Sequence, residues 1–391
     1  MALEISRGIF SVGVNDPDMR VFDVVVPTAF GSSYNAYLIR GEKATALVET
    51  VHEKKCGEFL ANLRAVCDIS KIDYIVMNHT EPDHSGSLVE LLKLAPRAKV
   101  VASASALKFL KKITNLEFES IAANASLRLD LGGKTLEFII APNLHWPDSM
   151  FTYVPEGGIL FTCDFLGAHY YEENHPLFSK VAAMDDYGVA LKVYFDCIFS
   201  PFKKFVQNGL QKIAALDLRI VCPSHGPILD DGIQKAIDTY AQWSAPEEVS
   251  RYAVVAYASA YGYTRILAET AEATLKENGY TAKIFDLGVT PPEIVAGEAN
   301  RADLLFVGTP TFNKDALLPV WNFIAHLSAI ANAGKKVGVF GSYGWSGEGV
   351  PLVVEHLKLM KYRVQGEGFR AVFKPSDSEI FAMKEYVKSC L

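Results

Sequence analysis

Asn78-His79-Thr80-Glu81-Pro82-Asp83-His84 is the most informative stretch of this 391-residue chain. It follows directly on Tyr74-Ile75-Val76-Met77, a short apolar run that predicts a buried strand. Four side chains able to bind a metal ion fall within six consecutive residues: His79, Glu81, Asp83 and His84. A group at the end of a rigid strand can be held accurately, so the stretch predicts a metal site there.

Three further ligand-type side chains occur in similar surroundings downstream. His145 lies in the loop Asn143-Leu144-His145-Trp146-Pro147-Asp148, and Asp164 and His225 each come just after a predicted strand. A single histidine at such a place is usually a turn residue or a satisfied core group. Seven ligand-type side chains at strand ends are not explained in that way, and together they predict one metal centre.

The composition is that of a globular protein with a sizeable core, since 50% of the residues are hydrophobic and 21% are charged. The length predicts two or three domains. A net charge of −7 and a pI near 5.8 argue against a nucleic-acid-binding surface. The sequence also lacks the uninterrupted apolar run of about 18 residues that a membrane helix needs. We therefore expect an acidic enzyme that binds neither nucleic acid nor membrane.

The six cysteines lie far apart and form no Cys-x-x-Cys pair: Cys56, Cys67, Cys163, Cys197, Cys222 and Cys390. This spacing predicts reduced thiols and not disulfides or a metal–sulfur site. Residues 1–7 lack the charged-then-apolar pattern of a secretion signal. A cytoplasmic location is the expectation.

The pattern of expected strands and helices changes near residue 245. Before that point, strands are expected at residues 9–12, 23–26, 33–39, 46–49, 74–77, 135–140, 150–154, 158–162 and 219–222, with a helix at 54–66. After residue 252, strands at 253–257, 282–286, 304–307 and 336–340 alternate with helices at 265–278, 318–331 and 350–360. Such alternation predicts an α/β unit with a doubly wound parallel sheet. We place the domain boundary near residue 249.

Three polar loops follow strands in the second half, at residues 259–264, 308–314 and 341–347. The first contains glycine and hydroxyl side chains, has no acidic residue and precedes a helix, which suits a dianionic phosphate. Neighbouring parallel strands end at one edge of the sheet, so the other two loops can flank a ring. The candidate cofactor-binding residues are Ser259, Tyr261, Gly262, Tyr263, Thr264, Thr309, Pro310, Thr311, Phe312, Asn313, Ser342, Tyr343, Gly344, Trp345 and Gly347. No Gly-x-Gly-x-x-Gly follows the first strand, which argues against a nicotinamide cofactor.

The motif His79-x-Glu81-x-Asp83-His84, with His145, Asp164 and His225 downstream, resembles the metallo-β-lactamase superfamily in the form found in flavodiiron proteins. The resemblance implies an αβ/βα sandwich and a diiron site over residues 1–249. One iron would take His79, Glu81 and His145, the other would take Asp83, His84 and His225, and Asp164 would bridge them. Most hydrolases of the superfamily have a second histidine where this chain has Glu81. A carboxylate is a harder ligand and favours iron over zinc.

Two neighbouring residues carry over from the same resemblance as catalytic candidates. His169 and Tyr194 resemble a histidine and a tyrosine that lie beside the diiron pocket of the family, where such groups can orient ligands or bound oxygen species. For Tyr194 a core aromatic on a helix stays open as the alternative. His52 and His175 match no motif, and we expect them to be ordinary surface or turn residues.

Residues 250–391 resemble flavodoxin and its FMN site. The resemblance implies that the first loop holds the FMN phosphate and that the other two carry the isoalloxazine ring. Tyr263 departs from the pattern, because the family commonly has Asn there, so we expect backbone donors, Ser259 and Thr264 to hold the phosphate. Trp345 is expected to pack against the flavin, with an exposed turn tryptophan as the alternative.

The resemblance covers essentially the whole chain and implies a flavodiiron oxidoreductase that reduces O2 to water, NO to N2O, or both. Electrons would pass through FMN from an external donor, since the sequence ends at Leu391 without a rubredoxin module. Rubredoxin is the expected donor, and a reduced deazaflavin of the F420H2 type is the alternative. The resemblance also implies a head-to-tail homodimer, alone or paired into a dimer of dimers.

Two other functions stay open at this stage. A dinuclear zinc hydrolase with a regulatory flavodoxin-like part would use the same scaffold, although Glu81 argues against it. A plain FMN electron carrier would need none of the seven ligand positions. The sequence does not rank O2 against NO, because pocket dimensions and the polarity around the metals govern that choice.

Overall fold

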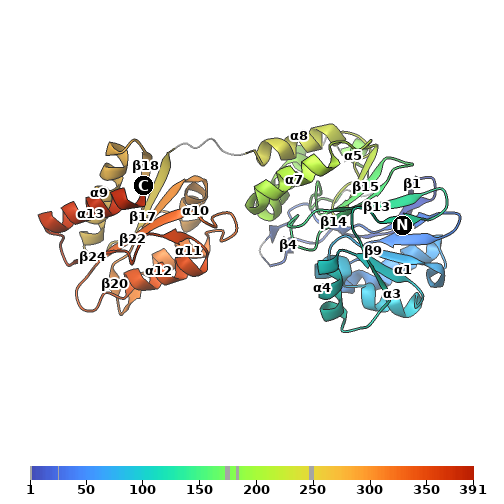
Figure 1. Cartoon of the computed structure of the whole chain (residues 1–391), viewed down its shortest axis with the longest axis horizontal. Coiled ribbons are helices and arrows are strands. Elements are labelled where there is room, and N and C mark those ends of the chain that lie inside the picture. The colour runs from blue at the N-terminus through green and yellow to red at the C-terminus, as the bar shows by residue number, and fades with distance from the viewer. Residues whose placement is uncertain (1, 25, 172–176, 182–184, 246–250) are drawn as a thin grey trace. The chain divides into compact units, whose positions relative to one another are not determined.

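A computed structural model of the chain describes residues 2–24, 26–171, 177–181, 185–245 and 251–391 (Figure 1). The chain divides into two compact units, Met1–Ala245 and Pro246–Leu391. The expected boundary near residue 249 and His175 both lie outside the described residues. In the described part of the chain, no helix is long and apolar enough to cross a membrane.

Two β-sheets form the centre of the first unit. The larger has the strand order β1-β2-β7-β8-β9-β10-β11, and its strands from β8 onward are parallel. These strands are β1 (Leu3–Ser6), β2 (Ile9–Ser11), β7 (Tyr37–Arg40), β8 (Thr45–Val48), β9 (Tyr74–Met77), β10 (Lys99–Ala102) and β11 (Ser120–Ala122). The smaller sheet contains β12 (Arg128–Asp130), β13 (Thr135–Ile140), β14 (Met150–Val154), β15 (Ile159–Cys163) and β16 (Ile220–Pro223), in that order.

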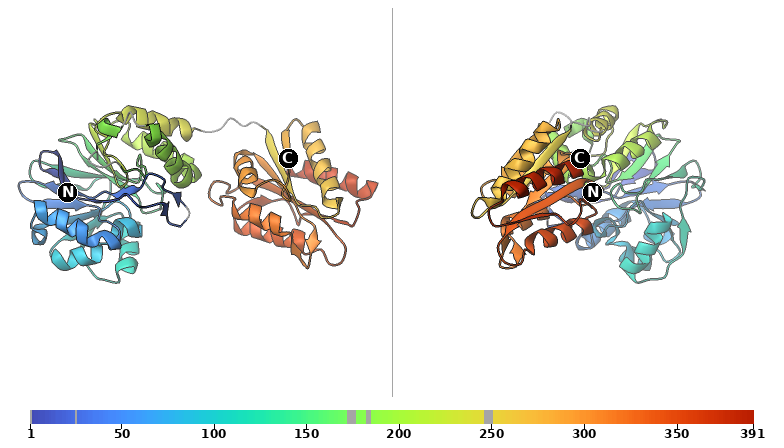
Figure 2. Two further views of the ribbon diagram at one scale, coloured as in Figure 1. Left: turned by 180° about the vertical axis from the view of Figure 1, so that it is seen from behind. Right: turned by 60° about the vertical axis from the view of Figure 1, so that its left-hand side comes forward.

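Helices cover the outer face of each sheet, as Figures 1 and 2 show from several sides. Side chains alternate along β9: Ile75 and Met77 pack into the core under the helices, whereas Val76 packs into the core shared with the smaller sheet. The helices on the larger sheet are α1 (Cys56–Val66), α3 (Leu88–Leu94) and α4 (Ala104–Thr114). Those on the smaller sheet are α6 (Asp185–Tyr194), α7 (Lys203–Ile213) and α8 (Ile233–Trp243). The predicted αβ/βα sandwich is confirmed.

The amino-terminal segment differs in part from the expected strands. Asp23 and Val24 have left-handed backbone, with φ of 46° and 56°, and lie between β4 (Val21–Phe22) and β5 (Val26–Pro27). The strand expected at residues 23–26 is therefore wrong, because a turn replaces its first half.

The strand expected at residues 33–39 is interrupted. Its first part, β6 (Ser32–Tyr34), pairs with β3 (Val14–Asp16), and the chain continues in β7. Between the two, the Asn35 backbone N–H bonds to the Ser224 carbonyl at 2.7 Å instead of joining a ladder. This bond ties the break in the strand to the loop that carries His225.

The second unit contains one six-stranded parallel sheet with the order β18-β17-β19-β22-β23, in which β24 also pairs with β22. Its strands are β17 (Tyr252–Tyr257), β18 (Thr281–Asp286), β19 (Leu304–Gly308), β22 (Lys336–Tyr343), β23 (Arg363–Val364) and β24 (Phe369–Val372). The strand order reverses beside β17, so ligands are expected at the carboxyl ends of β17 and β19. The predicted doubly wound sheet is confirmed.

Helices pack on both faces of this sheet (Figure 2). One face carries α9 (Tyr263–Glu277) and α13 (Asp377–Cys390), and the other carries α10 (Pro292–Arg301), α11 (Leu318–Ala325) and α12 (Gly349–Leu359). Helix α11 ends earlier than residue 331, at a turn where His326 Nδ1 lies 2.7 Å from the Asn322 carbonyl oxygen. A small hairpin, β20 (Thr311–Phe312) with β21 (Asp315–Ala316), stands in the loop after β19.

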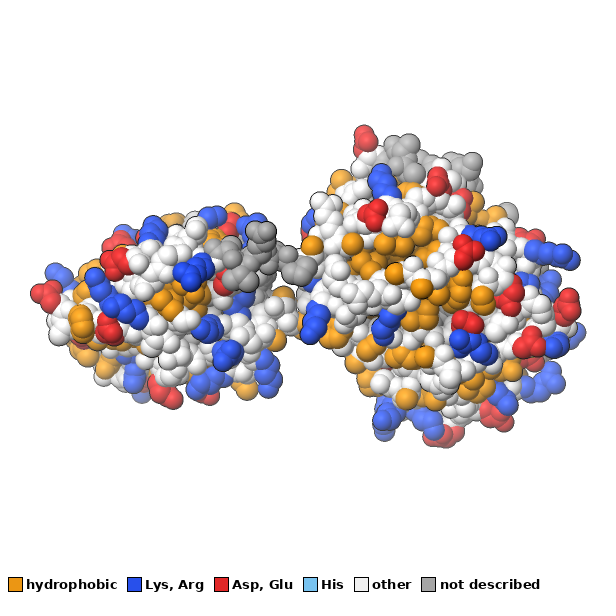
Figure 3. All heavy atoms as spheres, turned by 45° about the horizontal axis from the view of Figure 1, so that its top comes forward, with side chains coloured by type: hydrophobic (Ala, Val, Ile, Leu, Met, Phe, Trp, Pro, Cys, Tyr) orange, Lys and Arg blue, Asp and Glu red, His pale blue; other side chains and the backbone are white. Residues whose placement is uncertain are grey.

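Charged side chains of both signs lie on the visible face of each unit in Figure 3. Apolar side chains gather in one area of the first unit on the same face. This face therefore carries no single-sign field of the kind that attracts a polyanion.

Candidate functional site

The loop after β9 is fastened to both sheets of the first unit by Asn78. The Asn78 backbone N–H donates to Glu49 Oε1 at 2.7 Å, and its side-chain oxygen accepts from Thr152 Oγ1 at 2.7 Å. Pro82 then begins α2 (Pro82–Ser85), as proline favours the first turn of a helix. His79 and Glu81 therefore lie on the loop, whereas Asp83 and His84 lie on a short helix.

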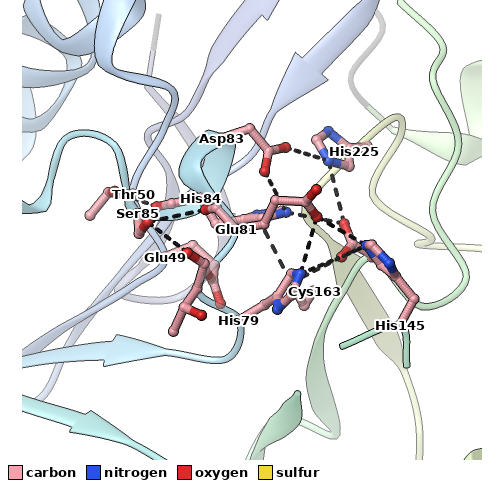
Figure 4. A network of polar contacts seen from close by, with 12 residues as sticks. Glu49, Thr50, His79, Glu81, Asp83, His84, Ser85, His145, Cys163 and His225 are labelled. Atoms are coloured by element: carbon pink, nitrogen blue, oxygen red, sulfur yellow. Dashed lines mark hydrogen bonds and ion pairs between the residues drawn. The ribbon is translucent and has the colours of Figure 1, made fainter. Parts of the chain in front are cut away.

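The remaining ligand-type side chains reach the same place from the smaller sheet. His145 comes from the loop after β13, Asp164 follows β15, and His225 follows β16. Because β15 and β16 are neighbouring parallel strands, they deliver Asp164 and His225 to one edge. Figure 4 shows how the cluster converges, and its members are buried apart from a partly exposed His145.

The first half of the cluster centres on Glu81. Its Oε2 lies 3.2 Å from His79 Nε2 and 3.0 Å from His145 Nε2. Asp164 Oδ2 lies 3.7 Å and 3.6 Å from the same two nitrogen atoms. Two imidazole nitrogens and two carboxylate oxygens therefore surround one point.

The second half of the cluster centres on Asp83. Its Oδ1 lies 3.3 Å from His84 Nε2, and its Oδ2 lies 3.1 Å from His225 Nε2. The other oxygen of Asp164, Oδ1, lies 3.2 Å and 3.4 Å from these nitrogens. The two oxygens of Asp164 thus face two different groups of donors, as a bridging carboxylate would.

The donor atoms in this cluster fit metal ions better than they fit one another. Both carboxylate oxygens of Asp83 and the Nε2 of His84 are buried without a hydrogen-bond partner in the described structure. Buried polar atoms without partners are costly, and cations would satisfy them. Four imidazoles and three carboxylates form a nitrogen–oxygen set that suits a hard or borderline metal such as iron.

Groups around the cluster hold the imidazoles in place. His79 Nδ1 lies 3.2 Å from Asp148 Oδ2, an oxygen that also accepts from the backbone N–H and the hydroxyl of Thr80 at 2.9 and 2.8 Å. His225 Nδ1 donates to the Ser33 carbonyl at 2.7 Å. Such partners fix the ring so that its other nitrogen faces the metal.

Asp148 was missed as a functional residue in the sequence, although it lies three positions after His145 in the same loop. It is fully buried, and its only signal was the short distance along the chain. Glu49 was missed as well: burial raises the pKa of its carboxyl to about 8, and it supports the loop through Asn78.

In the metal-free cluster, the positive charge of protonated histidines offsets the negative charge of the carboxylates. Burial disfavours the charged form of His225, but hydrogen bonds to carboxylates, first to Asp164, outweigh burial and raise its pKa to about 10. The same holds for His79: burial lowers its pKa, but hydrogen bonds to Asp148 and Glu81 outweigh burial and hold the pKa well above the usual value. The pKa values of Glu81 and Asp164 are lowered by nearby histidines despite burial. Metal ions would displace these protons, since a ligating imidazole must be neutral.

Both catalytic candidates lie against the cluster. The Tyr194 hydroxyl donates to Asp164 Oδ1 at 3.1 Å, and burial keeps its pKa well above the usual value. The His169 ring lies 4.8 Å from the His225 ring, and its Nδ1 lies 2.7 Å from Ser32 Oγ. Burial, followed by the charge of His225, holds the pKa of His169 well below the usual value, so it is neutral. His52, in contrast, caps a turn, as its Nδ1 accepts from Lys54 N at 3.1 Å.

The second unit has a crevice of about 280 Å³ at the carboxyl ends of its strands. Ten of the predicted residues line it: Tyr261, Tyr263, Pro310, Thr311, Phe312, Asn313, Ser342, Tyr343, Gly344 and Trp345. The other five predicted residues, which do not line it, are Ser259, Gly262, Thr264, Thr309 and Gly347. Lys314, Ser346 and Phe373 line it in addition, and Phe373 was missed because it follows β24, outside the three loops.

The first turn of α9 suits a phosphate. Gly262 has a φ of +84° and open space where a Cβ would stand, and as the N-cap residue it brings no side chain to cap the helix. The turn contains no acidic residue, so the backbone N–H groups of Tyr263 and Thr264 and the helix dipole can face an anion. Thr264 is buried with its hydroxyl 2.9 Å from Ser342 Oγ, and Ser259 Oγ accepts from Arg265 N at 3.3 Å.

Large aromatic rings at the crevice are exposed. Trp345 is 87% exposed and Tyr261 is 83% exposed, and Phe312 and Phe373 are more than half exposed. Apolar rings gathered at a concave site favour a planar aromatic ligand, because stacking would remove them from water.

Comparison with known proteins agrees with the two-unit fold. Residues 33–226 match the ODP family beta lactamase model, and residues 255–385 match the flavodoxin model. The chain is 44% identical over 387 residues to flavo-diiron protein FprA2 of Clostridium acetobutylicum, covering 97% of this chain and 96% of that protein. It is 34% identical to a nitric oxide reductase of Moorella thermoacetica, over 93% of this chain and 91% of the other.

A solved structure has the same architecture over the whole chain. Rubredoxin oxygen:oxidoreductase from Desulfovibrio gigas aligns with a TM-score of 0.71 and 25% sequence identity, covering 100% of this chain and 98% of the other. The arrangement of the two units along the sequence is therefore shared with proteins that reduce small molecules.

Proposed function

The chain belongs to the flavodiiron protein family, and from this premise we propose that its seven clustered ligands hold two iron ions bridged by Asp164. It is an oxidoreductase that carries FMN in the flavodoxin-like unit and a diiron site in the β-lactamase-like unit. The observation that carries the ligand assignment is the division of the Asp164 oxygens, with Oδ2 toward one donor group and Oδ1 toward the other.

One iron would be held by His79, Glu81 and His145, and the other by Asp83, His84 and His225. When bound, FMN accepts two electrons and releases them singly, and the iron pair passes electrons to a diatomic molecule. The three carboxylates offset most of the charge of two divalent ions, so the buried centre avoids a large uncompensated charge.

Tyr194 and His169 are proposed to serve the reaction without binding metal. The phenol of Tyr194 stays protonated and bonds to Asp164, so it can hold a proton beside the bridging position. The Nε2 of His169 has no hydrogen-bond partner in the described structure, so it is available to a water molecule or to substrate.

FMN is proposed to bind with its phosphate at the first turn of α9 and its ring against the aromatic side chains of the crevice. Backbone N–H groups would bind the phosphate, because Tyr263 has no side-chain amide such as the Asn common at this position would supply. Trp345 and Phe373 would lie against the ring.

The chain acts on O2 or NO and needs an electron donor, as its relatives do. We propose four-electron reduction of O2 to water, two-electron coupling of two NO to N2O and water, or both. Rubredoxin is the proposed donor, with a reduced deazaflavin as the alternative. We also propose a head-to-tail homodimer, and a reducing cytoplasm in which the six free cysteines remain thiols.

The test is anaerobic reduction of protein analysed for metal and flavin, followed by O2 and NO consumption with rubredoxin as donor. We expect two iron ions and one FMN per chain and consumption of at least one gas. Two zinc ions with no consumption of either gas would contradict the proposal and favour a hydrolase.

A further inference from the structure

A row of aromatic rings leads away from the metal centre toward the surface of the first unit. The ring centroids of Tyr194 and Phe199 are 5.9 Å apart, and those of Phe199 and Tyr240 are 5.7 Å apart. Trp243 follows, with its centroid 6.2 Å from Tyr240. Phe195 closes a second route, at 5.1 Å from Tyr240 and 5.2 Å from Trp243. The rings are therefore in continuous contact.

The two ends of the row differ in their surroundings. Tyr194 is buried, and its hydroxyl bonds to Asp164 at the metal cluster. Trp243 is only partly buried, and the Lys192 ammonium lies 5.5 Å above its ring. Lys192 is paired with Asp196 at 2.5 Å, so the tryptophan faces an ion pair and not a lone cation. The row therefore connects the reacting region with solvent.

Packing alone does not account for the hydroxyl in the middle of the row. Tyr240 is fully buried among phenylalanines, and its hydroxyl makes a long hydrogen bond of 3.4 Å to the Gly167 carbonyl. A phenylalanine would fill the same space without burying a polar group. A tyrosine, unlike a phenylalanine, can be oxidised by one electron at a moderate potential.

We propose that Tyr194, Tyr240 and Trp243 form a path that carries an oxidising equivalent from the metal centre to the surface when O2 meets a centre that is short of electrons. The inference rests on the proposed function. It assigns to this chain a second activity, which is protection of its own ligands from oxidation.

The electrons and protons balance along the path. Tyr194 gives one electron to the centre and its phenolic proton to Asp164, and Tyr240 then returns an electron to Tyr194, which recovers its proton. Tyr240 takes an electron from Trp243 as it gives one to Tyr194, so its phenolic proton stays on the hydroxyl that bonds to the Gly167 carbonyl. Trp243 releases its indole proton to water. A small-molecule thiol then gives Trp243 one electron and one proton, and the thiol is oxidised.

The test uses holoprotein reduced with less than the full complement of electrons and then exposed to O2 without thiol, with catalase present. Peptide mass spectrometry would measure oxidation at each tryptophan, and freeze-quench electron paramagnetic resonance would detect a tryptophan radical. We expect Trp243 to be oxidised several-fold more than Trp321, which is also only partly buried but lies in the other unit and outside the FMN crevice. Added thiol should suppress the oxidation of Trp243.

Two variants distinguish electron transfer through Tyr240 and Trp243 from a purely structural role of these residues. Tyr240→Phe should remove the oxidation of Trp243, and Trp243→Phe should shift oxidation to Tyr240, Tyr194 and the ligand histidines. Trp321→Phe, in the other unit, is the matched control and should change neither. O2 consumption with excess donor should stay unchanged in all three.

Two results would overturn the path: oxidation of Trp243 no higher than that of Trp321, or oxidation of Trp243 unaffected by Tyr240→Phe. Failure of the proposed function would look different, because the fully reduced wild-type holoprotein would then consume no gas at all.

Discussion

The metal centre and the FMN crevice are built in opposite ways. The seven proposed ligands of the metal centre come from several strand ends, have donor atoms 3.0 to 3.7 Å apart and are almost all buried, with His79 at 0% exposure. The crevice is made by loops of one sheet edge, and its largest ring, Trp345, is 87% exposed. The first site has its geometry fixed by the fold, whereas the second has surfaces that a ligand would cover.

This difference predicts how each site responds to a change. In the metal centre every group touches several others, so the loss of one should disturb the whole cluster. In the crevice each ring adds its own contact, so losses should be small and graded.

The largest effect is expected for Asp164→Asn, which removes the charge shared by both donor groups. We expect loss of both metal ions, and a fall in gas consumption larger than the roughly 10- to 100-fold typical of a partner outside the ligand set. Elemental analysis and gas-uptake assays would measure it, with the exposed Asp217→Asn as control. The FMN content should not change. Retention of two iron ions in Asp164→Asn would contradict the view that the loss of one group disturbs the whole metal centre.

The pH should act strongly on the metal centre and hardly on the crevice. The raised pKa of His225, about 10, means that its imidazole carries a proton at pH 7 in the metal-free protein. Metal binding must release that proton, so affinity should rise with pH up to about 10 and fall as pH is lowered. Each released proton contributes about tenfold per pH unit, so His225 alone gives roughly 100-fold between pH 8 and pH 6, and the proton on His79 makes the dependence steeper. Metal titration at these pH values would test it, and a pH-independent affinity would contradict the proton count.

Asp148→Asn should weaken metal binding without removing a ligand. The change removes the carboxylate that holds the His79 ring, and such changes cost about 10- to 100-fold in metal affinity. Competition with a chelator would measure the loss. Asp130→Asn makes the same chemical change at an exposed site in the same unit and should leave affinity unaltered.

The crevice should respond by smaller steps. Trp345→Ala and Phe373→Ala should each weaken FMN binding by up to about tenfold, because a stacked aromatic pair contributes about 0.5–1.5 kcal/mol. Phe381→Ala, which removes an exposed ring of α13 outside the crevice, should have no effect. Flavin fluorescence titration would decide, and an unchanged affinity for Phe373→Ala would remove that residue from the site.

The smallest effect is expected at Tyr263. Tyr263→Asn would add an amide near the phosphate, and one hydrogen bond contributes about 1 kcal/mol, which corresponds to about fivefold tighter FMN binding. Tyr263→Phe should leave the affinity as it is. Weaker binding of FMN by Tyr263→Asn would show that the tyrosine itself contacts the ligand.

The clustering of the seven proposed ligands could be predicted from the sequence because histidine and carboxylate side chains after apolar strands are local and chemically specific signals. Asp148 and Glu49 could not, because their roles depend on contacts with His79 and Asn78 that only the folded chain creates. The supporting groups of a metal site are tertiary features even when its ligands are not.

The errors in the fold have a similar cause. The valines after Asp23 favour a strand, but Asp23 and Val24 adopt left-handed backbone in a turn. Phe373 reaches the crevice because β24 pairs with the end of β22, a long-range pairing that no local pattern reveals. Most strand and helix positions could be predicted from periodicity. The turn at Asp23 and Val24 and the position of Phe373 depend on tertiary contacts, which periodicity does not show.

The most direct test of the central claim is anomalous diffraction at the iron absorption edge from crystals of the iron-loaded protein. Two peaks per chain are predicted, one among His79, Glu81 and His145 and one among Asp83, His84 and His225, with Asp164 between them. A single peak, or peaks present only at the zinc edge in protein that consumes neither gas, would contradict the account.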